Sequence, residues 1–142
     1  MSVFVVDGSV VLKWCIPEVH SDAARRWLES SHEYLAPDLI FAEVGNAIWK
    51  KVRRKELEEG EAQRLAKDVA GVAVETIPTR GLLPDAEALA LAIGITVYDA
   101  MYVALAARVD TQAITADDGL LRVMRQHPAS ARYVRSVEDL VA

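Results

Sequence analysis

The stretch Val3-Phe4-Val5-Val6, followed directly by Asp7-Gly8-Ser9, decides the class of fold. Four β-branched or aromatic residues in an unbroken row are typical of a strand that is buried on both faces of a sheet. Asp7-Gly8 then interrupts the apolar run, and residues 10–14 predict a short helix that stops before Pro17. The chain therefore begins with a buried strand that leads into a helix, the first part of a parallel βαβ unit.

Helices and strands continue to alternate along the rest of the chain. We expect helices near residues 21–28, 37–55, 60–69, 84–94, 99–108 and 117–125, and strands near 34–36, 72–76, 95–97, 112–115 and 133–134. This alternation predicts parallel βαβ units with helices on both faces of one sheet, which is an α/β fold. The length suits a single domain that spans residues 1–142.

The composition excludes several classes of protein. Hydrophobic residues make up 52% of the chain and charged residues 26%, which excludes disordered, collagen-like and coiled-coil proteins. The net charge of −5 argues against a protein that holds nucleic acid by coating its phosphates with basic side chains, but not against an enzyme that acts on nucleic acid. A lone cysteine, Cys15, excludes a disulfide within the chain and a cysteine-based zinc site.

The expected location is the cytoplasm. The single cysteine favours a reducing compartment. A strand-like run begins at Val3, where a signal peptide would need a charged segment and then a long apolar one. No apolar stretch approaches the ~18 residues of a membrane span, so we expect no membrane contact.

Carboxylates follow three of the expected strands. Asp7 follows the first strand, Asp99 follows residues 95–97, and Asp117 and Asp118 follow the strand near 112–115. Because functional groups of open parallel sheets lie beyond the carboxyl ends of the strands, we expect these side chains to converge. The expected long helix adds a fourth carboxylate, because Glu43 lies on its apolar face, where a carboxylate is unfavourable without a cation or hydrogen bonds.

Two interpretations of these carboxylates remain open. Each Asp precedes an expected helix, so each one taken alone suits an N-cap. Together with Glu43, however, they would repel one another unless a cation lay between them. Oxygen donors without His or Cys suit Mg²⁺ or Mn²⁺ better than Zn²⁺. Such a cation binds a phosphate oxygen and lowers the pKa of a water molecule, which suits phosphodiester hydrolysis.

Four motifs resemble those of the PIN-domain family, and the length is similar to that of the VapC toxins of toxin–antitoxin pairs. The motifs occur in order over nearly the whole chain: Val-Val-Asp-Gly-Ser at 5–9, Phe-Ala-Glu-Val-Gly-Asn at 41–46, Val-Tyr-Asp-Ala-Met-Tyr at 97–102 and Thr-Ala-Asp at 115–117. The resemblance implies a three-layer α/β/α sandwich with a central parallel sheet. It also implies a Mg²⁺- or Mn²⁺-dependent endoribonuclease, a cognate antitoxin and a homodimer.

The resemblance assigns roles to the acidic residues. Asp7, Glu43, Asp99 and Asp117 correspond to the catalytic, metal-binding acids of the family. We hypothesise that the three Asp residues hold one or two cations and that Glu43 positions or deprotonates a metal-activated water, which attacks the RNA phosphodiester.

Other polar residues receive supporting or alternative roles. Ser9 and Asn46 correspond to supporting positions of the family, where a hydroxyl or amide orients a carboxylate or a water. Asp118 is an alternative to its neighbour Asp117, which is preferred on the Thr-x-Asp pattern alone.

Basic and aromatic residues suggest where partners bind. Candidate RNA contacts are Lys50, Arg53, Arg54 and Arg122, although a basic helix end also suits the helix dipole without any ligand. Apolar residues of the helices near 21–28 and 37–55 would face an antitoxin, a second copy or simply each other; they are Trp27, Leu28, Ile48, Trp49 and Val52.

Two further functions stay open. One is an RNA-processing nuclease of the same family without an antitoxin, and the other is an inactive interaction domain. A metal-dependent adhesion module is disfavoured because Val11 stands where it needs Ser, and an aspartyl phosphotransferase because Ser9 stands where it needs Asp. A receiver domain is disfavoured because the Asp117-Asp118 pair comes late in the chain.

Overall fold

The computed structural model describes residues 2–141 and places β1 at the centre of a five-stranded parallel sheet with the order β3-β2-β1-β4-β5. The strands are β1 (Val3–Val6), β2 (Glu33–Pro37), β3 (Glu75–Ile77), β4 (Ala113–Thr115) and β5 (Val134–Ser136). Val5 pairs with Leu35 on β2 and with Ala113 on β4. Phe4, Val5 and Val6 are buried, as the apolar row predicts, whereas Val3 at the start of the strand is 39% exposed.

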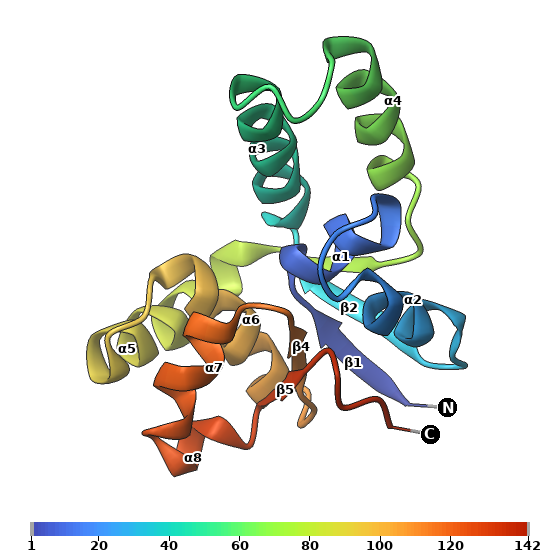
Figure 1. The fold of residues 1–142 in the computed structure, drawn as a ribbon. Coiled ribbons are helices and arrows are strands. Elements are labelled where there is room, and N and C mark those ends of the chain that lie inside the picture. Colours follow the sequence, from blue (N-terminus) through green and yellow to red (C-terminus); the bar gives the residue numbers. More distant parts are fainter. Residues whose placement is uncertain (1, 142) are drawn as a thin grey trace.

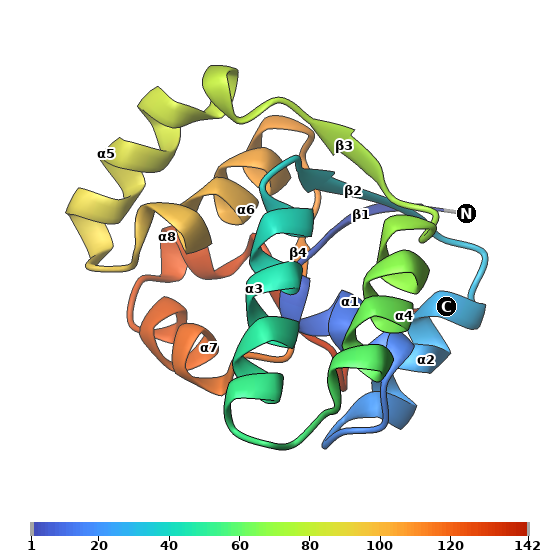
Figure 2. The same ribbon diagram turned by 90° about the horizontal axis from the view of Figure 1, so that it is seen from above.

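Helices connect the strands and cover both faces of the sheet. Their bounds are α1 (Gly8–Cys15), α2 (Ser21–Glu29), α3 (Ile40–Arg53), α4 (Glu59–Ala70), the 3-10 helix η1 (Thr79–Leu82), α5 (Leu83–Ile93), α6 (Val97–Arg108), α7 (Asp118–Arg125) and α8 (Pro128–Ala131). Helices α1 and α2 lie on one face, and α5, α6 and α7 lie on the other (Figures 1 and 2). The predicted α/β/α sandwich with a central parallel sheet is confirmed.

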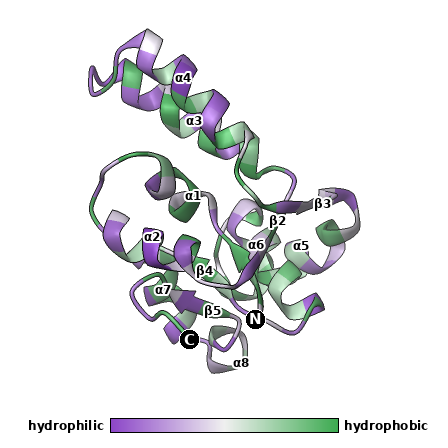
Figure 3. Ribbon diagram, turned by 90° about the vertical axis from the view of Figure 1, so that its right-hand side faces the viewer, coloured by the Kyte–Doolittle hydropathy of each residue, from purple (hydrophilic) through white to green (hydrophobic). Residues whose placement is uncertain are grey.

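Helices α3 and α4 form an antiparallel pair that extends away from the sheet (Figure 3). α3 packs on α4 and on α1, and its residues Val44 and Ile48 are buried there. The adjacent Trp49 is 57% exposed, and the guanidinium of Arg53 lies 5.6 Å from the centre of its ring. α3 therefore packs on its neighbours through buried residues and keeps apolar surface, at Trp49, in solvent.

The indoles of the two other tryptophans belong to the core. Trp27 is completely buried and donates a hydrogen bond to the carbonyl of Val137 at 2.7 Å. Trp14 donates to the carbonyl of Ala24 at 2.8 Å. Of the alternatives left open for Trp27 and Ile48, packing within the chain applies, because both side chains are buried and offer no surface to a partner.

Helix α6 is the most buried helix of the second face. Residues 100–106 are all buried, so α6 is apolar around most of its circumference, as expected for a helix enclosed by β1, β2 and α5. Taken singly, no helix within residues 2–141 has the length and hydropathy needed to cross a membrane; the segments 79–93 and 97–108, bent by 115°, meet these criteria only as a pair.

The expected strand at 95–97 is wrong. Val97 begins α6, and the hydroxyl of Thr96 accepts a hydrogen bond from the backbone N–H of Asp99 at 3.1 Å. The β-branched residues suggested a strand, but Thr96 acts as an N-cap and so stabilises a helix start at this point. Asp99 consequently lies in the first turn of α6 and not at the end of a strand.

Two other boundaries differ from expectation. Pro37 is the last residue of β2, opposite Ile77, and α3 begins three residues later, at Ile40. β3 covers residues 75–77 and not 72–76. The turn at residues 38–39 was predicted as part of the helix that follows it, and residues 72–74 as part of the strand that follows them. Gly94 fulfils its expected role after α5, with a φ of 79° in the left-handed region.

Candidate active site

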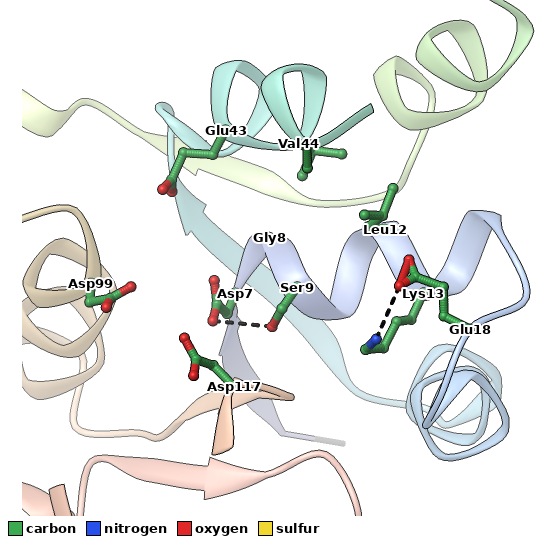
Figure 4. A pocket seen from close by; sticks show the side chains of 11 residues that line it. Asp7, Gly8, Ser9, Leu12, Lys13, Glu18, Glu43, Val44, Asp99 and Asp117 are labelled. Atoms are coloured by element: carbon green, nitrogen blue, oxygen red, sulfur yellow. Dashed lines mark hydrogen bonds and ion pairs between the residues drawn. The ribbon is translucent and has the colours of Figure 1, made fainter. Parts of the chain in front are cut away.

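A pocket of about 340 Å³ lies at the carboxyl ends of β1 and β4. These neighbouring strands make connections in opposite directions, since β1 leads to β2 while β4 is reached from β3 across the other face. Ligands of open parallel sheets bind at such a switch point. Five carboxylates line the pocket. Glu18 lies at one end, paired with Lys13, and the other four come from four parts of the chain and gather at the opposite end (Figure 4): Asp7, Glu43, Asp99 and Asp117.

Asp7 lies deepest in this group, between β1 and α1. Its Oδ2 accepts hydrogen bonds from the hydroxyl of Thr115 at 2.7 Å and from that of Ser9 at 3.2 Å. Burial raises the pKa of Asp7, and the charge of Asp117 raises it further, while the two hydroxyls lower it. Asp7 is the N-cap residue of α1, and the backbone N–H of Ser9 also lowers its pKa, but its side chain forms no capping hydrogen bond of standard geometry. The hydroxyls of Thr115 and Ser9, more than capping, therefore hold this carboxylate.

Thr115 is the functional residue that sequence reasoning missed. It is 1% exposed, and besides donating to Asp7 its hydroxyl accepts the backbone N–H of Asp117 at 3.0 Å. Ser9 acts in parallel, because its hydroxyl also accepts the N–H of Ala116 at 3.1 Å. The signal was available: a hydroxyl in a short buried strand needs a partner, and the nearest strand end carries a carboxylate.

The other two Asp residues differ in what they do for their helices. Asp117 is the N-cap of α7, and its Oδ1 accepts the backbone N–H of Leu120 at 3.1 Å. Asp99 is not a cap, since Thr96 caps α6. The pKa of Asp99 is raised to about 6, first by burial and then by the charges of Asp7, Asp117 and Glu43. The capping interpretation thus applies to one of the three Asp side chains.

Glu43 completes the group from α3, where it is partly buried. Its Oε1 accepts a hydrogen bond of 2.6 Å from the hydroxyl of Tyr102. Burial raises the pKa of Glu43, the hydrogen bond from Tyr102 lowers it, and the charge of Asp7 raises it. The pKa of Tyr102 is itself raised, chiefly by burial and then by the bond to Glu43, so the phenol remains protonated and acts as the donor.

The donor set matches a hard divalent cation in its chemistry. The lining is rich in carboxylate oxygens, and Lys13, the only cation among the described residues that line the pocket, lies 3.5 Å from Glu18 and so is already paired. Burial and the neighbouring carboxylates raise the pKa of Asp99, and a bound cation would lower this pKa again. Across residues 2–141, no three His, Cys, Asp or Glu side chains are grouped as a ready-made metal site.

The structure does not bring every expected residue to this pocket. Asn46 is exposed on α3 and does not line it, so the expected supporting role has no counterpart in the geometry. Both residues of the adjacent pair are exposed, but Asp117 lines the pocket and Asp118, on the first turn of α7, does not. The candidate RNA contacts are exposed and lie outside the lining: Lys50, Arg53, Arg54 and Arg122.

Known proteins share both the sequence pattern and this architecture. The family model of the PIN domain matches residues 4–126. The chain belongs to the PIN-domain family. Ribonuclease VapC3 of Pyrobaculum aerophilum is 38% identical to this PIN domain over 115 residues, which cover 80% of this chain and 88% of that protein. The crystal structure of PAE2754 from Pyrobaculum aerophilum superimposes on it with a TM-score of 0.67 and 28% identity, covering 97% of this chain and 93% of that one.

More distant PIN-like structures share the fold. A toxin–antitoxin complex from Klebsiella pneumoniae gives a TM-score of 0.64 at 13% identity, covering 96% of this chain and 99% of that one. VapBC2 from Rickettsia felis, bound to a DNA fragment from its promoter, gives 0.62 at 11% identity, covering 94% and 98%. The overall fold of this PIN domain is therefore shared by structures with little sequence identity to it.

The raised pKa of Asp99 predicts how stability depends on pH. Between 3.8 and about 6 the folded protein binds more protons at Asp99 than the unfolded chain, so this group lowers the free energy of unfolding as pH rises through that range. We expect Asp99→Asn to raise the Tm of chelator-treated protein at about pH 8 and to lose this effect at about pH 4. Thermal unfolding followed by circular dichroism measures both, with Asp118→Asn as the control. An equal Tm difference at both pH values would contradict the assignment.

Proposed function

We propose that this protein is a divalent-metal-dependent endoribonuclease of the VapC type, the toxin of a toxin–antitoxin pair. The observation that carries the proposal is the convergence of four carboxylates on one pocket, in a PIN domain that is 38% identical to ribonuclease VapC3. Phosphodiester hydrolysis needs charge neutralisation and an activated water, and a carboxylate-held cation supplies both.

Three aspartates of the pocket are the proposed metal ligands. Asp7, Asp99 and Asp117 would hold Mg²⁺ or Mn²⁺, which binds a phosphate oxygen and lowers the pKa of water when present. Thr115 and Ser9 hold Oδ2 of Asp7, so Oδ1 is the oxygen that would be left to bind a cation.

Glu43 has a separate role as the base. Its Oε1 is occupied by the hydroxyl of Tyr102, so Oε2 is the oxygen left to orient the attacking water and to take its proton. The raised pKa of Glu43 brings its proton affinity closer to that of an effective base near neutral pH.

Lys13 lies farther along α1 at the other end of the same pocket (Figure 4). Its ammonium group is 3.5 Å from Glu18, and Glu18 is also 3.7 Å from Lys51. Lys51 would continue to neutralise Glu18 after Lys13 had left it. Lys13 would therefore lose little electrostatic stabilisation when it binds a backbone phosphate of RNA in place of Glu18. Beyond the pocket, RNA contacts the exposed basic residues Lys50, Arg53, Arg54 and Arg122.

The proposed protein partners are a cognate antitoxin and a second copy of the chain, in the cytoplasm. Support for an antitoxin comes from the likeness to VapC3 and from apolar surface that a partner would cover. Trp49 on α3 is 57% exposed and Leu28 on α2 is 43% exposed. An antitoxin helix that covers Trp49 would pass beside the pocket wall that carries Glu43.

Asparagine variants separate the metal-binding role from helix capping. Asn is as good an N-cap as Asp, so Asp117→Asn keeps the cap of α7, and Asp7→Asn and Asp99→Asn remove no standard capping bond; all three variants should fold normally. We expect each to lose at least about 100-fold in Mn²⁺-dependent RNA cleavage, because each loses a charged ligand. Asp118→Asn, next in the chain but outside the pocket, is the matched control and should cleave like wild type.

The products provide a second criterion in the same assay. A water nucleophile leaves a 5′-phosphate and a 3′-hydroxyl, which ligation or mass spectrometry identifies. Normal cleavage by all three variants, or a 2′,3′-cyclic phosphate from the wild type, would refute this mechanism.

Lys13 yields a prediction about substrate affinity. Lys13→Gln should raise KM for RNA and reduce the slope of log affinity against log salt by about 1, with kcat nearly unchanged. Filter binding over a salt series measures the slope. Lys67→Gln, an exposed change on α4, is the control. If the two variants show the same slope, Lys13 does not contact phosphate.

A further inference from the structure

Tyr102 connects three walls of the acidic pocket from within the core. It belongs to α6, three residues after Asp99, and is 2% exposed. Its hydroxyl donates to Oε1 of Glu43 on α3 at 2.6 Å. The same hydroxyl lies beside the start of α1, because a Cβ added to Gly8 would be 3.9 Å from it. A single phenol thus lies where α1, α3 and α6 meet.

We propose that Tyr102 is a positioning residue, which holds the carboxylate of Glu43 in its working orientation over the pocket; this inference rests on the proposed nuclease function. Glu43 is attached through three rotatable bonds and projects from α3, a helix that extends away from the sheet (Figure 3). Tyr102 has only two rotatable side-chain bonds, and its ring is fixed by packing in the core. The hydrogen bond therefore transfers the rigidity of α6 to Glu43.

The geometry also decides which carboxylate oxygen acts. A phenol has one proton to donate, and Tyr102 directs it to Oε1. Oε2 is then the free oxygen of Glu43, and its direction is set by the bond at Oε1. Without the hydroxyl, Glu43 would populate several rotamers, and the fraction of molecules with Oε2 correctly placed would fall.

The close approach of α1 to α3 belongs to the same arrangement. A Cβ at Gly8 would lie 3.2 Å from Cγ2 of Val44 and 3.8 Å from Cγ1 of Ile40, which is tighter than ordinary packing at the first atom. Glycine at this position brings the residue after Asp7 against the helix that carries Glu43. The base and the deepest metal-binding carboxylate are therefore placed relative to one another through backbone contact and through Tyr102.

Tyr102→Phe tests the proposal because it removes the hydroxyl and keeps the ring. We expect kcat for cleavage of single-stranded RNA with Mn²⁺ to fall by about 10- to 100-fold with KM unchanged. In a Glu43→Gln background, the same change should lower kcat by less than about twofold, since Tyr102 acts through Glu43. A structural role alone would lower kcat by the same factor in both backgrounds.

Tyr34→Phe is the matched control for loss of a buried hydroxyl. Tyr34 is also buried, and its hydroxyl donates to the carbonyl of Trp27, away from the pocket. It should lose stability in thermal unfolding but keep its kcat. NMR provides a measurement that does not depend on catalysis. The ¹³C chemical shift of the Glu43 carboxyl in metal-free protein should change in Tyr102→Phe and remain the same in Tyr34→Phe.

The outcomes separate this inference from the proposed function. An unchanged kcat in Tyr102→Phe, an equal loss in the Glu43→Gln background, or an unmoved Glu43 signal would overturn the positioning role. A wild type that cleaves no RNA with Mn²⁺ or Mg²⁺ would instead refute the nuclease proposal, and the carboxyl signal would still report whether Tyr102 orders Glu43.

Discussion

The structure depends on placing a partly buried carboxylate, Asp7, at the end of its central strand. Burial of this group is unfavourable, and the hydroxyls of Thr115 and Ser9 offset part of the cost by hydrogen bonding to one of its oxygens. Glu43, Asp99 and Asp117 add like charge beside it, and the cation that lines the pocket, Lys13, is paired with Glu18, so repulsion among the four acids remains. Buried, mutually repelling carboxylates lower the stability of the folded protein, and groups with strongly shifted pKa values of this kind are characteristic of functional sites. A divalent cation relieves both burial and repulsion at once.

The fold supplies what this site requires. The pairing of β1 with β4 brings the two strand ends together, and the hydroxyl of Thr115 bonds across them. Helix α6 packs on the sheet as a core helix; its first turn places Asp99 in the pocket, and Tyr102, one turn later, bonds to Glu43 from the core. α3 contributes Glu43 from a helix pair that packs mainly on α1. Rigid elements therefore carry the acids, and the apolar residues around them keep the pocket partly shielded from water.

Much of this arrangement could be predicted from the sequence, for physical reasons. The unbroken row at 3–6 has few structural solutions other than a central strand, and the four motifs identified the acids that line the pocket. Residues 95–97 were misjudged because Thr and Val favour strands on average, whereas the local cap at Thr96 favours a helix. Asn46 shares a helix with Glu43, but helical phase alone did not place it in the pocket.

The contribution of Thr115 was missed although its hydroxyl in a buried strand was a signal, whereas those of Tyr102 and Lys13 could not be predicted, because they depend on how distant parts of the chain meet at the pocket. The central claim is that the acids form one cation site. It is tested most directly by crystals soaked in Mn²⁺, measured at a wavelength where manganese scatters anomalously. The account predicts an anomalous peak in the pocket bonded to Asp7 and Asp99. A peak bonded to neither, with Asp7 still held only by Thr115 and Ser9, would contradict it.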